Sequence, residues 1–208
     1  MSQLKLKNAS GYSASLVPSS SMSSDKTFTL PTSASGTLLT TGNLGNVGKV
    51  LQLVQTTKID RQSITATDTP MPVDIANFNV TITPSATTSK VLVHFTLHVG
   101  TEGYLFLNLL RGTTNIAQGT QDGSNRIACS VSVNQTGAYE TTPWSFMYLD
   151  SPATTSQITY KVNGFLSQYA NNTNAGPYTA FINRPRNYDD QDYTGNPMST
   201  ITAMEIGA

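Results

Sequence analysis

The chain has little of the charge on which most enzymes and nucleic-acid-binding proteins depend. Charged residues make up 12% of its 208 residues, against about 25% in an average soluble domain. Basic and acidic residues number 12 each, so the formal net charge is zero, and no basic stripe is visible. Without such a stripe the protein has no electrostatic hold on nucleic acid or on an anionic membrane, and we expect neither as a partner.

Cysteine is also nearly absent, because Cys129 stands alone. A single cysteine excludes a disulfide within the chain and suits assembly in a reducing cytosol. Residues 1–5 lack the apolar core of a signal peptide, and no apolar run is long enough to span a membrane. We therefore expect a protein that is made in a cytosol and does not insert into a membrane.

Helical periodicity is missing from every stretch of ten residues, whereas strand-like segments separated by turn residues fill the chain from residue 49 onward. In the clearest segment, residues 90–99, apolar side chains stand at every second position, as in a half-buried strand. Residues 104–110 are almost continuously apolar, which predicts a strand covered on both faces. The predicted strands are 50–54, 79–83, 90–99, 104–110, one near Ile116, 126–133, 144–149, 157–162, 178–182 and 199–206. This number and spacing predict an all-β, antiparallel, jelly-roll-like β-sandwich head.

The first 48 residues have a different composition and form the predicted N-terminal arm of the 49–208 head. Short alternating segments at 4–7 and 26–30 resemble strands, and a Ser-rich stretch, 10–24, lies between them. Large apolar side chains are too few here to offset the entropy of ordering the segment. We expect an extended arm that becomes ordered on a partner surface or on neighbouring copies; the alternative is a plain disordered tail.

The two histidines, His94 and His98, lie in the strand predicted at 90–99. On a strand they share one face but stand about 13 Å apart, which is too far for both to bind one metal ion. We interpret them as part of a polar face, at a subunit contact that responds to pH; completion of a metal site by a neighbouring chain is the alternative. No cofactor is expected.

The densest acidic cluster, Asp189, Asp190 and Asp192, lies in a loop. Such a run usually forms a solvated turn, and calcium binding is the alternative. Other carboxylates lie in unrelated segments, with no motif that brings two of them together: Asp74, Glu102, Glu140 and Asp150. Nucleophile and nucleotide-binding motifs are absent too, and Cys129 lies in a strand-like run where a thiol is usually part of the packing. No catalytic residue is predicted.

Tyrosines surrounded by Asn, Gln and Gly are the best candidates for recognition. Tyr169 precedes Asn171 and Asn172, and Tyr188 and Tyr193 lie in the loop of the acidic cluster. Aromatic faces together with amide donors and acceptors suit the recognition of a sugar or a protein. The alternative is that these tyrosines only cover the ends of the sandwich.

Several phrases of the sequence resemble known viral proteins. Residues 26–31 (KTFTLP) and 36–42 (GTLLTTG) resemble the start of many tailed-bacteriophage fibre and virion proteins. The later phrases resemble a β module of phages of marine and cyanobacterial hosts: 109–114, 149–155, 160–162, 181–184 and 199–206. The resemblance implies a non-enzymatic virion structural protein with a β-sandwich head that forms a homotrimer. The chain has no long shaft between arm and head, which favours a short fibre, a spike or a capsid decoration over a long tail fibre.

We therefore expect a virion protein, made and assembled in the host cytoplasm, whose arm attaches to capsid, portal, neck or tail proteins. Its head is expected to contact a glycan or protein of the host surface. Two alternatives remain, a capsid decoration or cement protein (a head fibre) that stabilises the shell, and an enzyme that degrades surface polysaccharide.

Overall fold

The computed structural model describes residues 4–7, 13–16, 48–65, 72–124, 126–134, 136–167 and 178–207. The chain divides into two compact units, Met1–Asn43 and Leu44–Ala208. In the first unit β1 (Leu4–Lys7) pairs antiparallel with β2 (Ser13–Leu16). The first strand confirms the prediction, whereas the second falls in the Ser-rich stretch and was missed. The strand predicted at 26–30 lies outside the described residues.

The second unit, the head, is made of strands, and its described residues contain no helix. No helix that is long and apolar enough to cross a membrane therefore occurs in the described part of the chain. The strands are β3 (Val50–Lys58), β4 (Gln62–Thr65), β5 (Val73–Ile82), β6 (Lys90–Thr101), β7 (Leu105–Arg111), β8 (Thr114–Asn115), β9 (Val131–Val133), β10 (Thr142–Asp150), β11 (Ile158–Leu166), β12 (Thr179–Ile182) and β13 (Ser199–Ile206).

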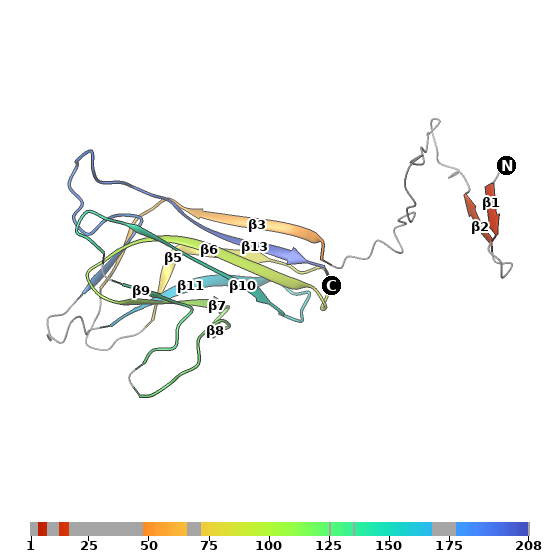
Figure 1. The fold of residues 1–208 in the computed structure, drawn as a ribbon, viewed down its shortest axis with the longest axis horizontal. Coiled ribbons are helices and arrows are strands. Elements are labelled where there is room, and N and C mark those ends of the chain that lie inside the picture. The colour runs from red at the N-terminus through yellow and green to blue at the C-terminus, as the bar shows by residue number, and fades with distance from the viewer. Residues whose placement is uncertain are drawn as a thin grey trace. The chain divides into compact units, whose positions relative to one another are not determined.

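The strands form a six-stranded and a five-stranded antiparallel sheet (Figure 1). In the first sheet β12 and β13 lie end to end along one edge of β6, with β4 and β3 beside them, and β10 covers the other edge of β6. In the second sheet β11 separates β5 from β7, and β8 and β9 share the far edge of β7.

Counting each end-to-end pair as one position leaves eight strand positions in the described part of the head. Their chain order is 1-8-3-6 in the first sheet and 2-7-4-5 in the second. Two sheets wound in this order are the double Greek key of a jelly roll. The sandwich and its jelly-roll topology confirm the predicted fold class.

The core fills the space between the two sheets. The odd-numbered side chains of β6 from Val91 to Val99 are fully buried, as their alternation predicts. Phe95 meets Phe78 of the opposite sheet edge to face, with ring centroids 6.3 Å apart. Each such apolar side chain contributes about 1.5–3 kcal/mol of transfer free energy. β7 is buried on both faces over most of its length, as predicted.

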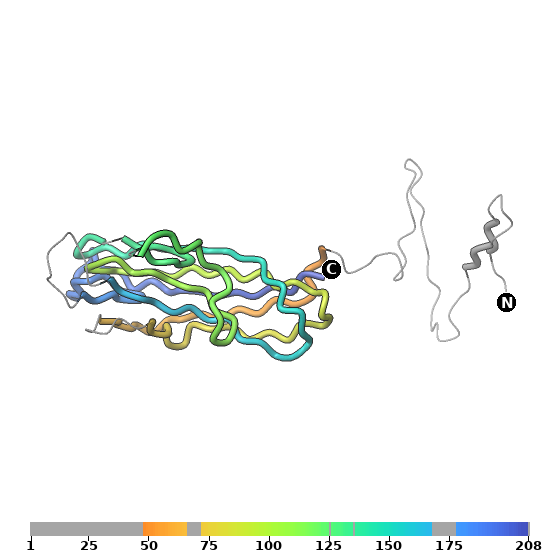
Figure 2. Tube along the Cα trace, turned by 90° about the horizontal axis from the view of Figure 1, so that it is seen from below, coloured from red at the N-terminus to blue at the C-terminus, as the bar shows by residue number. Residues whose placement is uncertain are grey.

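The strands run along the length of the head, so its loops gather at two ends (Figures 1 and 2). At one end, which we call proximal, Gly48 donates its N–H to the Gly207 carbonyl at 2.7 Å. β13 begins at the opposite, distal end, where Ser199 pairs with Lys58. Eight residues of β13 separate the two ends by about 25 Å.

The structure corrects one predicted strand, 126–133, of which only β9 is a strand. The side chain of Gln121 donates to the Arg126 carbonyl and accepts from Ala128 N, and Gln118 donates to the Ala128 carbonyl at 3.2 Å. Side-chain amides thus satisfy the backbone where a neighbouring strand would otherwise do so. Cys129 therefore lies outside a strand. Its side chain is half-buried, and this burial raises the pKa of the thiol.

Candidate functional site

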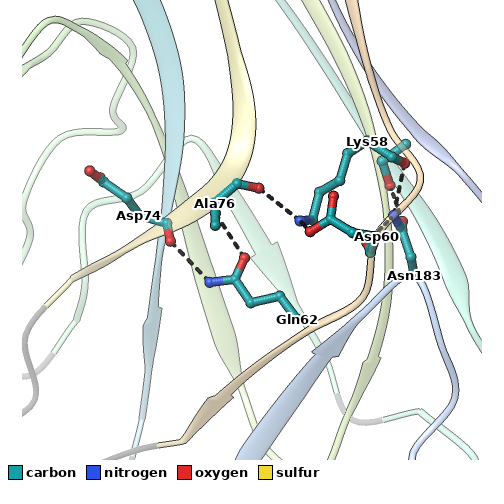
Figure 3. A network of polar contacts seen from close by, with 7 residues as sticks. Lys58, Asp60, Gln62, Asp74, Ala76 and Asn183 are labelled. Carbon is teal, nitrogen blue, oxygen red and sulfur yellow. Dashed lines mark hydrogen bonds and ion pairs between the residues drawn. The ribbon is translucent and has the colours of Figure 1, made fainter.

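A polar network around the buried Lys58 side chain joins the end of β3 to the start of β4 (Figure 3). The Lys58 ammonium group is fully buried and donates to Asp60 Oδ2 at 2.6 Å and to the Ala76 carbonyl at 2.7 Å. The hydrogen bond from Lys58 lowers the pKa of Asp60. Gln62 exchanges two hydrogen bonds with the β5 backbone, donating to the Asp74 carbonyl and accepting from Ala76 N. The network ties the break between the two strands to the opposite sheet.

Asn183 anchors the matching break between β12 and β13. Its amide donates to the carbonyls of Lys58 and Asp60 at 2.9 and 3.0 Å, and its oxygen accepts from Ser199 Oγ at 2.6 Å. Its φ of 60° lies in the left-handed region, where Asn is tolerated better than most residues. The chain can therefore leave the sheet sharply at this point and form the loop of residues 183–198.

This loop passes over the outer face of the first sheet at its distal end. A Cβ added at Gly100 of β6 would lie 2.8 Å from the carbonyl oxygen of Arg184 and 3.1 Å from Arg186 N. Only glycine permits so close an approach between the loop backbone and the strand. Further along, Asn187 N donates to the Ala138 carbonyl at 2.7 Å, which joins the loop to the segment before β10.

Two arginines and two aromatic rings stack where the loop leaves the sheet. The Arg184 guanidinium carbon lies 4.1 Å from the ring centroid of Phe181 and 5.6 Å from that of Tyr188, and Arg61 lies 4.5 Å from Tyr188. Burial lowers the pKa of Arg184, and the neighbouring charge of Arg61 lowers it further. Within the described ranges, neither guanidinium forms an ion pair with a carboxylate.

A second aromatic pair extends this surface. Tyr193 meets Tyr139 edge to face with ring centroids 5.2 Å apart, and both are exposed, Tyr193 to 58%. The Tyr188 hydroxyl donates to Asn196 Oδ1 at 2.7 Å, which braces the loop across its base. We call Arg61, Tyr139, Arg184, Tyr188 and Tyr193 the distal cluster.

The distal cluster can bind ligands in two ways. Exposed tyrosine rings offer flat faces for stacking, and phenol hydroxyls donate and accept hydrogen bonds. The two guanidinium groups form no ion pair with a carboxylate of the described residues, so they can contact a ligand with negative charge or many hydroxyl groups.

The structure places the predicted recognition residues as follows. Tyr188 and Tyr193 lie exposed in the distal cluster, whereas Tyr169, Asn171 and Asn172 lie outside the described residues. Sequence reasoning missed Arg61, Tyr139 and Arg184. The three missed residues lie far apart in the sequence, so no local pattern groups them. The one local indication of a basic surface is the pair of arginines on either side of Pro185.

The acidic cluster of the same loop forms a turn. Thr194 donates through its hydroxyl to the carbonyls of Asp189 and Gln191, at 2.8 and 2.9 Å. Among the described residues, no group of three or more His, Cys, Asp or Glu has the arrangement of a metal site. Asp189, Asp190 and Asp192 are among these described residues, so they do not form such a group.

His94 and His98 point to the outer face of the first sheet, as predicted, and both are half-buried. Burial lowers the pKa of His98. His98 also joins the polar network through its backbone, since its N–H donates to Ser199 Oγ at 2.9 Å.

The four carboxylates considered for catalysis each have a structural partner of their own. Asp150 accepts from Arg111 and Tyr160, and Asp74 accepts from Lys161 at 2.6 Å. The backbone N–H of Thr179 donates to Glu102, and that of Gly137 donates to Glu140. Each of the four carboxylates therefore has a hydrogen-bonding role in the structure of the head.

Comparison with known proteins yields a distant structural likeness. The sequence matches no protein-family model and no curated protein. A structure of infectious bursal disease virus, Gt strain, is similar with a TM-score of 0.42 and 14% identity over 94% of this chain and 47% of that chain. The VP2 subviral particle of the same virus gives 0.36 and 16%, over 76% of this chain and 38% of that chain. The chain thus spans less than half the length of the chains it matches.

Proposed function

We propose that the protein is a non-enzymatic structural protein of a tailed-bacteriophage virion, a short fibre or spike. Its arm attaches to the particle, and its jelly-roll head is exposed and recognises the host surface. The observation that carries the proposal is the placement of the distal cluster. It lies at the end of the head opposite to Gly48, where the chain enters the sandwich.

The chemistry of the distal cluster suggests the kind of ligand. Stacking rings beside guanidinium groups that form no ion pair within the described residues suit an acidic or phosphorylated surface glycan, and a host protein is the alternative. The resemblance of residues 109–114 and 199–206 to a phage β module supports the viral setting. A homotrimer is the assembly that we propose for the head.

The experiment compares particles that carry the wild-type protein with particles that carry Arg61→Ala plus Tyr193→Ala. Adsorption to host cells is expected to fall by about tenfold or more, since aromatic and arginine contacts commonly dominate binding energy. Arg126→Ala is the matched control, because Arg126 is an exposed arginine in a different loop. Purified wild-type protein is expected to block infection, and the double variant is not.

Other outcomes would overturn the proposal. Particles that lack the protein but adsorb normally and burst more readily would identify a capsid decoration or cement protein. Release of sugars from host envelope by the purified protein would identify an enzyme. Normal incorporation after deletion of residues 1–47 would refute the role of the arm.

A further inference from the structure

Among the described residues of the head, one loop covers the outer face of the first sheet, and it does so at the distal end. At the distal end the backbone of Arg184–Arg186 lies against Gly100, so the loop of residues 183–198 covers the sheet. Toward the proximal end three rows of outward side chains cross β3, β13, β6 and β10. We call these three rows the proximal face.

Of these three rows, the one nearest the proximal end is apolar across all four strands; the next outward residue of β6, Lys90, is charged and exposed. Leu53 pairs with Met204, Met204 with Leu92, and Leu92 with Leu149. Directly opposed residues of antiparallel strands point to the same side, so the four side chains form one continuous strip. Leu53 is 60% exposed and Leu149 is 46% exposed. Contiguous exposed apolar surface of this kind marks an interaction site more often than scattered single residues do.

The other two rows of the proximal face are polar but uncharged. The second row contains Met147, which is 61% exposed, beside His94, and Gln55 donates to Thr202 Oγ1 at 2.8 Å. The third row consists of Thr and Ser only, and Thr96 and Ser145 share a hydrogen bond of 2.8 Å. No Asp, Glu, Lys or Arg occurs in the three rows.

These features favour a second copy of this chain as the occupant. Surfaces without formal charge can meet around a threefold axis or in a dimer with no like-charge repulsion, whereas a charged partner would find no counter-charge here. Hydroxyl groups both donate and accept, so the same Thr and Ser side chains can pair across an interface. Depletion of charge around an apolar centre is also the composition of protein interfaces.

The area of the proximal face can be compared with the area that a stable protein interface buries. Four strands about 4.8 Å apart and three rows about 6.7 Å apart outline roughly 400 Å². A stable interface buries about 800 Å² per partner. The proximal face thus supplies about half of such an interface, with its apolar row along one edge, and residues that border it supply the rest.

We propose that copies of this chain associate through the proximal face. The inference names a surface for the homotrimer proposed above, and surface charge and composition carry it whatever the head binds. Attachment of several arms to one site on a particle would strengthen the contact by raising the local concentration of heads, and this argument alone rests on the proposed function.

A matched pair of methionines provides the test. Met147 lies on the proximal face and Met198 lies outside it, in the loop before β13, and they are 61% and 60% exposed. The full chain is expected to be oligomeric by light scattering. Met147→Lys should raise the concentration needed for assembly by at least about tenfold, because it places a charge in an uncharged contact, whereas Met198→Lys should leave assembly unchanged. A single cooperative unfolding transition in each variant would show that both are folded.

A second measurement needs no substitution. Dilute peroxide is expected to oxidise Met198 faster than Met147 in the assembled protein, since oxidation follows exposure. A monomeric wild-type chain, an oligomer that tolerates Met147→Lys, or equal oxidation of the two methionines in the oligomer would each overturn the proposal. A monomer that still blocks infection would leave host recognition intact, and an oligomer that does not block it would overturn recognition alone.

Discussion

At the scale of single residues, buried charges show how this weakly charged chain uses its few ionisable groups. Asp150 is 5% exposed and accepts two hydrogen bonds from Arg111, at 2.8 and 3.0 Å, and one from the Tyr160 hydroxyl at 2.6 Å. Burial raises the pKa of Tyr160, and its hydrogen bond to the Asp150 carboxylate raises it further. The three side chains join the end of β10 to the second sheet.

Asp150→Ala is expected to lower the free energy of unfolding by about 2–3 kcal/mol, because it leaves Arg111 and Tyr160 without their buried acceptor. Tyr160→Phe removes one donor only and should cost about 1 kcal/mol. Denaturant titration of both variants measures the difference. An Asp150→Ala protein as stable as the wild type would show that the contact contributes nothing to stability.

Glu205 predicts a dependence of stability on pH. It is buried, which by itself would raise its pKa, but hydrogen bonds from Ser85 N and Oγ outweigh burial and lower the pKa below 4.5. The unfolded chain therefore takes up this proton first as the pH falls. The ionised Glu205 therefore stabilises the folded state fully above about pH 4.5. This contribution to the free energy of unfolding is lost as the pH falls through the lower pKa that Glu205 has in the folded state.

Unfolding free energies measured between pH 6 and pH 3 test this dependence. Glu205→Gln cannot ionise, so its stability should fall less steeply than that of the wild type over the acid range. Ser85→Ala removes one of the two donors and should give an intermediate slope. Parallel pH profiles for the wild type and Glu205→Gln would contradict the assignment.

At the scale of elements, the position of the 183–198 loop depends on its contact with β6. Gly100→Ala places a methyl group against the backbone of Arg184 and Arg186, neither of which can yield without moving the loop. We expect a loss of about 1–3 kcal/mol in unfolding free energy and weaker binding by the distal cluster. Gly119→Ala is the control, since its Cβ would meet nothing closer than the Cys129 carbonyl at 3.9 Å. Equal stability of the two variants would show that the loop adapts freely.

At the scale of the whole molecule, the jelly roll encloses the described apolar core. Within the described residues, the buried cluster that forms this core runs from Ile64 to Ala203 and belongs to the head. Each sheet takes strands from both halves of the head sequence, so the sandwich closes only when β12 and β13 have joined the first sheet. Long-range pairing of this kind predicts slow folding.

Deletion of residues 1–47 should leave one cooperative unfolding transition with the same denaturant midpoint as the full chain. The physical reason is that the described core lies entirely within the head. Calorimetry or fluorescence of the two proteins provides the measurement. A shifted or split transition in the shorter protein would show that the first 47 residues contribute to the stability of the sandwich.

The sequence by itself determined the class of fold and most strand positions, because alternation and turn residues are local signals. The alternating side chains of residues 90–99 and the turn residues between segments specify β6 and its buried face. β4 was missed since Ile64 is the only apolar residue among its four, and pairing with β12 makes it a strand. Only the tertiary structure decided the distal cluster and the proximal face. Arg61, Tyr139 and Arg184 come together, as do Leu53, Leu92, Leu149 and Met204, through strand order and register between distant segments, which no local pattern encodes.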